Sequence, residues 1–205
     1  MEFIMTDLNK NLGNPTRVLS ISGSLRRESF NTGLLKAAQE LAPEDMEITI
    51  FDLEDIPFYN ADVEAEGDPE SVLALKKAVH DADALLLATP EYNGGIPAPL
   101  KNAIDWASRS TSGYQESAMF GKTVAIMGGG GGGAVRAQNQ LRQVLSALGI
   151  EALEQPEVNV AMVWDKFDEN GRLIDHKTRE QINELLLALE EQLTHRDTLA
   201  EVLAA

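Results

Sequence analysis

The sequence predicts an α/β protein in which a five-stranded parallel sheet is covered by helices on both faces. Short apolar segments alternate five times with segments of helical periodicity, as a helix-covered parallel sheet requires. The segment 84–88 is apolar throughout, which is typical of a strand buried on both faces. A chain of 205 residues that is 43% hydrophobic is also long enough for one domain with a substantial core.

Apolar runs place the five strands. In the second of them Ile48 and Ile50 alternate with polar residues, so we expect that strand to have one less buried face. The expected strands are residues 18–21, 46–52, 84–88, 123–127 and 158–160.

Apolar residues spaced three and four positions apart place a helix after each strand. Pro69 suits the opening of the second helix, because a proline is tolerated in a first helical turn. The expected helices cover residues 34–41, 69–79, 100–107, 141–148 and 182–193. The acidic segment 53–67, before the second helix, is expected to be an irregular surface loop.

The ends of the chain differ in character from its middle. Residues 1–16 are polar, without the basic and apolar regions of a secretory signal, and are expected to be a loose leader before a single domain at 17–193. The tail 194–205 either continues the last helix or frays. No apolar run approaches the roughly 20 residues that span a membrane. The absence of cysteine is compatible with the cytoplasmic location that we expect.

Five alternating strands favour the flavodoxin-like order 2-1-3-4-5 among doubly wound folds. In that order the loops after strands one, three and four meet at the carboxyl edge of the sheet. These loops are residues 22–32, 90–95 and 128–133, the three least ordinary stretches of the sequence. We therefore expect a binding site at this edge.

The first of these loops has the composition of a phosphate site. It joins a strand to a helix start, where free N–H groups and the helix dipole favour an anion. Its serines, Thr32, Asn31 and two arginines can all donate hydrogen bonds. Neither the Walker A pattern nor G-x-G-x-x-G is present. The alternative is an ordinary turn rich in helix-capping residues.

The other two loops suit a planar ligand. In 90–95, Tyr92 can flank a ring while Asn93 and backbone N–H groups bond its polar edge, although Pro, Asn and Gly also make ordinary turns. The third loop consists of six glycines, Gly128 to Gly133. At any position whose backbone accepts alanine, a glycine makes the protein less stable than alanine would. A run of six therefore indicates that the backbone approaches a ligand closely or that several φ angles are positive. The alternative is a mobile loop without contacts.

Composition and spacing weigh against other kinds of function. A formal net charge of −16 argues against nucleic-acid binding and against an anionic membrane surface. His80, His176 and His195 lack metal-ligand spacing, and no G-x-S-x-G pattern marks a serine nucleophile. The carboxylates that follow the second strand are expected to form a solvated rim. These are Asp52, Glu54 and Asp55.

Four motifs together resemble the NAD(P)H-dependent FMN reductase family, which includes bacterial chromate, quinone and azo-dye reductases. The resemblance covers roughly residues 17 to 190. It is carried by Gly23-Ser24-Leu25-Arg26 with Ser29-Phe30-Asn31, by Pro90-Glu91-Tyr92-Asn93, by the 100–106 stretch LKNAIDW, and by the 167–173 stretch FDENGRL. The six-glycine run departs from the family, where side chains often occupy that loop.

The resemblance implies a flavodoxin-like protein that holds FMN non-covalently and takes a hydride from NADPH or NADH. Residues 90–94 would line the isoalloxazine ring, and the Gly128 region would close its other side. The expected cofactor-binding residues are Ser22, Ser24, Arg26, Ser29, Phe30, Asn31, Thr32, Pro90, Glu91, Tyr92, Asn93, Gly94, Gly128, Gly129 and Gly130. Of these, Ser24, Arg26, Ser29, Asn31 and Thr32 are expected at the phosphate.

The implied reaction is ping-pong transfer of electrons to a small acceptor, namely a quinone, chromate, an azo dye, a ferric chelate or free flavin. Two alternatives remain open, a flavodoxin-type electron carrier and an FMN-binding sensor. The family resemblance also implies a homodimer or homotetramer. Trp106, Tyr114 and the segment 189–203 could contribute to such an interface or complete the core. The sequence distinguishes neither the physiological acceptor nor NADPH from NADH.

Overall fold

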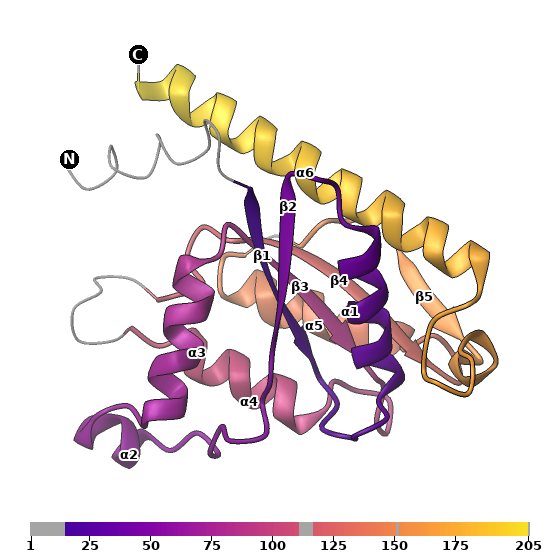
Figure 1. Cartoon of the computed structure of the whole chain (residues 1–205). Helices are drawn as coiled ribbons and strands as arrows, with labels where there is room; N and C mark the ends of the chain where they lie inside the picture. The colour runs from indigo at the N-terminus through magenta and orange to yellow at the C-terminus, as the bar shows by residue number, and fades with distance from the viewer. Residues whose placement is uncertain (1–14, 111–116, 151, 205) are drawn as a thin grey trace.

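The computed structural model describes residues 15–110, 117–150 and 152–204 (Figure 1). Its sheet has five parallel strands in the order β2-β1-β3-β4-β5, which confirms the predicted topology. The strands are β1 (Thr16–Ser22), β2 (Met46–Phe51), β3 (Ala84–Thr89), β4 (Thr123–Gly130) and β5 (Val158–Ala161).

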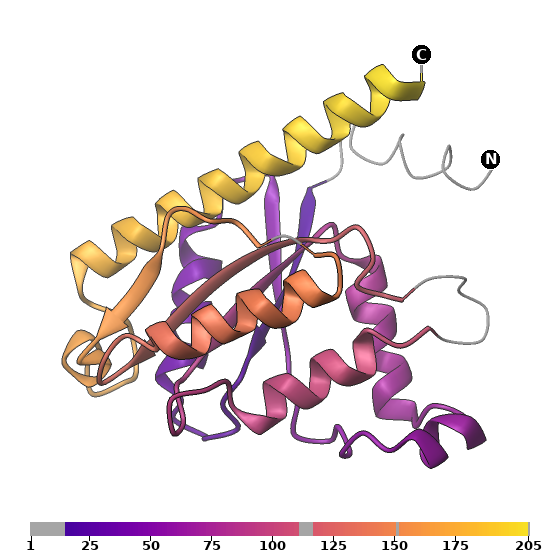
Figure 2. The same ribbon diagram turned by 180° about the vertical axis from the view of Figure 1, so that it is seen from behind.

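Helices cover both faces of this sheet, so the fold has three layers. Helices α1 and α6 lie on one face and α3, α4 and α5 on the other, as the front and back views show (Figures 1 and 2). The helices are α1 (Phe30–Leu41), α2 (Ala61–Glu66), α3 (Glu70–Asp81), α4 (Ala98–Ala107), α5 (Val135–Ala147) and α6 (His176–Ala204), with a short 3₁₀ helix η1 (Val163–Lys166).

Alternate residues of the central strands pack into two separate cores. In β3, Leu86 faces the core under α1 and α6, whereas Leu85 and Leu87 face the core under α3, α4 and α5. All six residues of this strand are buried. This two-sided burial is why the sequence of β3 shows no polar alternation.

The strand register brings the predicted loops together. Ser22 at the end of β1 is paired with Ala88, and Thr89 at the end of β3 is paired with Gly128. The chain segments that leave these three strands therefore begin side by side at the carboxyl edge, the lower edge of the sheet in Figure 1.

Several boundaries differ from the sequence prediction. Segment 53–67 is not irregular throughout, because α2 forms within it and Asn60 caps this helix by accepting a hydrogen bond from the Asp62 N–H at 2.9 Å. Strand β4 continues through Gly130, since pairing with β5 extends to that residue. The tail is helical as far as Ala204. Residues 1–14, most of the expected leader, lie outside the described residues.

The 100–106 motif holds the segment that follows β2. The side-chain N–H groups of Asn102 and Trp106 both donate to the Pro57 carbonyl, at 2.9 and 2.8 Å, and the Asn102 carbonyl accepts from the Tyr59 N–H at 2.7 Å. Trp106 is fully buried, so of the two roles left open it completes the core. Tyr114 lies outside the described residues.

A charged cap starts α6. The Asp175 carboxylate accepts from the Thr178 N–H at 2.9 Å, from the Thr178 hydroxyl at 2.7 Å and from the Lys166 ammonium at 2.8 Å. The hydrogen bond from Lys166, followed by those from Thr178, lowers the pKa of Asp175 to about 2. The cap therefore ties η1, which carries Lys166, to the start of the last helix.

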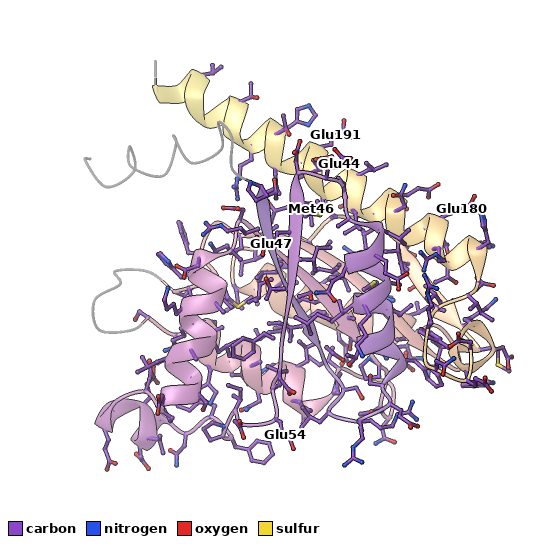
Figure 3. All side chains as sticks on the ribbon, in the orientation of Figure 1. Glu44, Met46, Glu47, Glu54, Glu180 and Glu191 are labelled. Atoms are coloured by element: carbon purple, nitrogen blue, oxygen red, sulfur yellow. The ribbon has the colours of Figure 1, made fainter. Side chains whose placement is uncertain are left out.

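The acidic charge is spread over the surface. Figure 3 labels five exposed glutamates. Glu180 and Glu191 lie along α6, Glu44 and Glu47 lie at the start of β2, and Glu54 lies beyond its end. Among the described helices, none has both the length and the apolar composition needed to cross a lipid bilayer.

Candidate flavin site at the carboxyl edge

The loop after β1 is ordered by its own hydroxyl groups. Ser22 Oγ accepts from the Ser24 N–H at 3.3 Å, and Ser24 Oγ accepts from the Arg26 N–H at 3.3 Å. Ser29 caps α1 by accepting from the Thr32 N–H at 3.3 Å. These residues therefore act as capping residues, as the alternative interpretation expected. The same hydrogen bonds also hold the loop at the positive end of the α1 dipole.

Arg26 is held in the same loop by an aromatic ring. Its guanidinium carbon lies 4.9 Å from the centre of the Phe30 ring, and the group also donates to the Glu28 carbonyl. Phe30 in turn packs against Phe167, with 5.2 Å between ring centres. Phe30 and Phe167 thus support the position of a cation at the start of α1.

Asn31 joins the first loop to the glycine run. Its side-chain N–H donates to the Gly129 carbonyl at 3.1 Å, and its carbonyl accepts from the Gly129 N–H at 2.9 Å. Both residues are buried. The carbonyl and one N–H of the Asn31 side chain are thus used to hold the Gly129 backbone. A direct phosphate contact from its second N–H stays a prediction.

The loop after β3 is a tight turn. Tyr92 and Gly95 exchange two backbone hydrogen bonds of 3.1 Å, and the residues between them, Asn93 and Gly94, have φ of 52° and 79°. Two successive positive φ values define a type I′ turn, for which Asn-Gly is the favoured pair. The turn leaves the Tyr92 side chain 53% exposed on the rim of the edge.

Glu91 connects this turn to α5. Ala134, before α5, makes no side-chain cap, but the Glu91 carboxylate accepts from the Arg136 N–H at 2.9 Å in the first turn of the helix. Its second oxygen lies 3.8 Å from the Arg136 guanidinium. Further along, Gln140 Oε1 accepts from the Ile96 N–H at 3.2 Å. A carboxylate at a helix N-terminus is stabilising, so Glu91 fixes the turn and α5 relative to each other.

The six glycines fall into two groups. At Gly128 an added Cβ would lie 2.6 Å from the Thr89 carbonyl oxygen, and at Gly129 it would lie 2.7 Å from Val163. Gly133 has φ of 76°. The fold therefore requires these three glycines. At Gly130 and Gly132 an added Cβ would meet no described atom within 4 Å, and at Gly131 it would meet only the Trp164 ring, at 3.6 Å.

The glycine run is anchored by backbone contacts. The Gly131 carbonyl accepts from the Met162 N–H at 3.2 Å, and Gly132 forms a bridge with Ala161. These contacts contradict the alternative of a loop without contacts. The first loop also packs against the second, because an added Cβ at Gly23 would lie 3.3 Å from Pro90, and 2.7 Å from Pro97 just beyond that loop. The three predicted loops thus form one interlocked edge.

Sequence reasoning missed two contributors to this edge. Trp164 in η1 is 48% exposed and lies next to Gly131. Arg136 donates its backbone N–H to the Glu91 carboxylate. Trp164 follows β5 and could have been found by the same rule that places loops at the carboxyl ends of strands. The contact between Glu91 and Arg136 is long-range and left no local pattern.

The other candidate chemistries gain no support from the described residues. Within these residues no group of three His, Asp or Glu side chains is placed to hold a metal ion. His80, His176 and His195 are exposed. Asp52, Glu54 and Asp55 are exposed beyond the end of β2, where a solvated rim was expected.

The sheet is flavodoxin-like, and its carboxyl edge brings together the hydroxyl-rich start of α1, the turn at Tyr92 and the glycine run. These features define a flavin-binding protein of the doubly wound class. The chain belongs to the NADPH-dependent FMN reductase family, whose model matches residues 16–165. This match confirms the resemblance, the oxidoreductase class and the predicted dependence on FMN and NAD(P)H.

Named relatives cover most of the chain. It is 46% identical over 176 residues to an NAD(P)H-dependent FMN reductase of Pseudomonas aeruginosa, covering 85% of this chain and 93% of the relative. It is 40% identical over 181 residues to an NADPH:quinone oxidoreductase of Arabidopsis thaliana, covering 85% and 90%. Among solved structures, the flavoenzyme NAD(P)H:(acceptor) oxidoreductase FerB of Paracoccus denitrificans superposes with a TM-score of 0.78 at 35% identity, covering 88% and 98%.

Proposed function

We propose that the protein is an NAD(P)H-dependent FMN reductase that passes electrons to a quinone by a ping-pong mechanism. The observation that carries the proposal is the interlocked edge of the sheet. Three loops that are distant in sequence are joined there by direct contacts, among them those of Asn31 with Gly129 and of Glu91 with Arg136. The name of the relative from Arabidopsis thaliana, an NADPH:quinone oxidoreductase, supports a quinone as the acceptor.

The first loop is suited to the FMN phosphate. Ser29 and Thr32 lie at the start of α1, and Ser24 lies in the loop before it. Arg26 adds a positive charge in a chain whose formal net charge is −16. Local donors must hold the phosphate against this overall charge. Asn31 contributes by fixing Gly129, and Ser22 by fixing Ser24. Hydrogen bonds to a charged group contribute about 1.5–3 kcal/mol each, so a few of them support micromolar binding.

The other two loops are suited to the isoalloxazine ring. The segment 90–94 offers turn backbone and the exposed Tyr92 side chain, and Gly128 to Gly130 offer backbone without side chains on the opposite side. Gly130 leaves room for a flat ring, because an added Cβ at this residue would meet no atom of the described chain within 4 Å. The residues present therefore fit the cofactor that the family uses.

Bound FMN supplies the redox chemistry by accepting a hydride and later releasing two electrons. The protein residues bind and orient. Glu91 and Asn31 keep the loops at a fixed separation, and Tyr92 stands at the open side. If reductant and acceptor both approach from this side, they must use it in turn, which is the structural basis for proposing a ping-pong mechanism.

An anaerobic visible spectrum tests the reaction class. The protein reconstituted with FMN is expected to bleach on addition of NADPH, or of NADH, and to regain its absorbance on addition of 1,4-benzoquinone without any partner protein. Bound flavin that stays oxidised with both nucleotides would favour the carrier or sensor alternatives. A protein that does not retain FMN would overturn the proposed site.

A cytoplasmic homodimer or homotetramer is also proposed. The family resemblance supports it, together with exposed apolar side chains such as Phe58 on the segment after β2 and Leu73 on α3. Light scattering coupled to size-exclusion chromatography measures the mass directly. A single species of 22.3 kDa would overturn the oligomer.

A further inference from the structure

The 167–173 stretch forms a tight turn that presents one aromatic ring to the protein. The Asp168 N–H donates to the Arg172 carbonyl at 2.9 Å, and Asp168 Oδ1 accepts from the Arg172 N–H at 2.8 Å. The backbone of Phe167 forms a bridge with that of Leu173. Only 9% of Phe167 is exposed, so the turn holds this ring in the interior.

The Phe167 ring lies directly against the backbone of α1. An added Cβ at Gly33 would lie 2.5 Å from Phe167 Cε1 and 3.2 Å from Cζ. Glycine within a helix is destabilising relative to alanine, and Gly33 has no positive φ that would require glycine. The close approach of the Phe167 ring therefore explains why α1 contains a glycine at this position.

The same ring supports a second ring, which in turn supports a cation. The centres of the Phe167 and Phe30 rings are 5.2 Å apart, and the Arg26 guanidinium carbon lies 4.9 Å from the centre of the Phe30 ring. Arg26 is exposed and Phe30 is half-buried. An exposed arginine loses rotamer freedom when it is held in one place, so the ring beneath it helps to fix its position. Without Phe167, the Phe30 ring is free to turn into the vacated space.

We propose that Phe167 is a positioning residue for the FMN phosphate and acts through Phe30 on the guanidinium of Arg26. This inference rests on the proposed function, which assigns the phosphate to the loop that carries Arg26. In this role Phe167 makes no contact with the cofactor. Its effect is confined to the attraction between Arg26 and a charged group, so binding of an uncharged flavin should not depend on it.

Titrations of the apoprotein with FMN and with riboflavin, which lacks the phosphate, isolate this effect. The ratio of the riboflavin Kd to the FMN Kd measures what the phosphate contributes to binding. Phe167→Leu keeps an apolar side chain but removes the ring, and it should lower this ratio about twofold to fivefold, the value of one exposed cation–π contact. A merely structural loss would weaken both ligands equally and leave the ratio unchanged.

Leu189→Ala is the matched control for general loss of stability. Leu189 is fully buried in the same core as Phe167, but it lies in the middle of α6. Its truncation leaves a cavity and lowers the free energy of unfolding. The ratio of the two dissociation constants should nevertheless remain that of the wild type.

Two further variants test the route through Arg26. In the Arg26→Ala background, Phe167→Leu should cause no additional fall in the ratio, because the guanidinium on which it acts is gone. Gly33→Ala displaces the Phe167 ring from the other side, through the Cβ that would lie 2.5 Å from it, and should also lower the ratio. This variant removes no side chain from the core, so it decides the question if Phe167→Leu does not fold.

The outcomes separate the positioning role from the proposed function. A wild-type ratio in Phe167→Leu would overturn the positioning role, as would an equal fall in the presence and absence of Arg26. A wild-type ratio in Arg26→Ala alone would overturn both the phosphate loop and the positioning role. If the ratio falls in Arg26→Ala but not in Phe167→Leu, only the positioning role is rejected. The reductase reaction is judged independently, by whether bound FMN bleaches with NADPH or NADH.

Discussion

The side chain of Asn31 holds the backbone of Gly129 by two hydrogen bonds, one to its carbonyl and one from its N–H, across 98 residues of sequence. Because both residues are buried, water does not compete for these bonds in the folded protein. The start of α1 and the end of β4 are consequently fixed relative to each other before any ligand binds.

Asn31→Ala should therefore lower both stability and flavin affinity. It leaves a buried N–H and a buried carbonyl without partners, which destabilises by about 1–3 kcal/mol. Urea unfolding of the apoprotein and FMN titration measure the two effects. Gln39→Ala is the control, since Gln39 donates to the Ile48 carbonyl at 2.8 Å from the same helix but away from the site. Equal FMN affinities in all three proteins would contradict the positioning role.

Arg26→Ala should weaken FMN binding about tenfold to a hundredfold, because it removes a charged donor worth about 1.5–3 kcal/mol. Fluorescence titration with FMN measures the dissociation constant. Arg27→Ala is the neighbouring comparison, with the same loss of charge but no contact to the Phe30 ring among those described. A variant that purifies with full flavin and unchanged affinity would show that the phosphate is bound elsewhere.

The two groups of glycines should respond to alanine in opposite ways. In the apoprotein, Gly130→Ala and Gly132→Ala are expected to raise the free energy of unfolding by about 0.4–1 kcal/mol each, because their backbone accepts an L-residue and the unfolded chain loses freedom. Gly128→Ala should lower it, since the new Cβ would lie 2.6 Å from a backbone oxygen. Urea unfolding decides the sign; destabilisation at all three positions would contradict the division.

Glu91→Ala should loosen the turn at Tyr92 together with the start of α5. Loss of a capping acceptor destabilises by about 0.5–2 kcal/mol, and FMN affinity should fall because the turn is no longer fixed. Glu91→Gln retains an acceptor and should keep most of both. Asn60→Ala removes a comparable cap from α2 and is expected to leave FMN affinity intact. If Asn60→Ala and Glu91→Ala affect FMN equally, the effect is one of global stability.

The cap of α6 predicts a specific loss of stability in acid. The pKa of Asp175 is lowered from 3.8 to about 2 in the folded protein, so its contribution is fully present above about pH 4 and disappears as the pH falls towards 2. Allowing for partial exposure, we expect about 1–2 kcal/mol from this group. The difference in unfolding free energy between wild type and Asp175→Asn should shrink over that interval. A difference that is constant from pH 2 to 5 would exclude the carboxylate as its source.

The strand order and the meeting of three loops could be predicted because they depend on local patterns. The continuous apolar run at β3 and the Asn93-Gly94 turn are both set by neighbouring residues, and their structures are confirmed. Extension of β4 to Gly130 was missed, since glycine has low strand propensity and only pairing with β5 overrides it. The side-chain role of Asn31 was also out of reach, because its partner is distant in sequence.

The composition of the glycine run could not separate structural from ligand-facing positions. All six residues are identical in sequence, and only the surroundings of each Cβ distinguish Gly128 from Gly130. In the same way, Trp106 and Trp164 are equivalent as residue types, yet one is buried against Pro57 and the other lies exposed at the carboxyl edge. These differences in burial and surroundings arise from tertiary packing, which local sequence patterns do not predict.

The position of β3 in the sheet has a consequence for how the protein acquires its cofactor. Because β3 lies between β1 and β4, the loops at Ser22 and Gly128 reach their places only after a strand from the middle of the chain has inserted between them. Contacts of this long range form late and slowly in folding. An N-terminal fragment ending before β4 would hold the first loop but not its counterpart. Flavin uptake by a nascent or refolding chain should accordingly coincide with completion of the whole sheet.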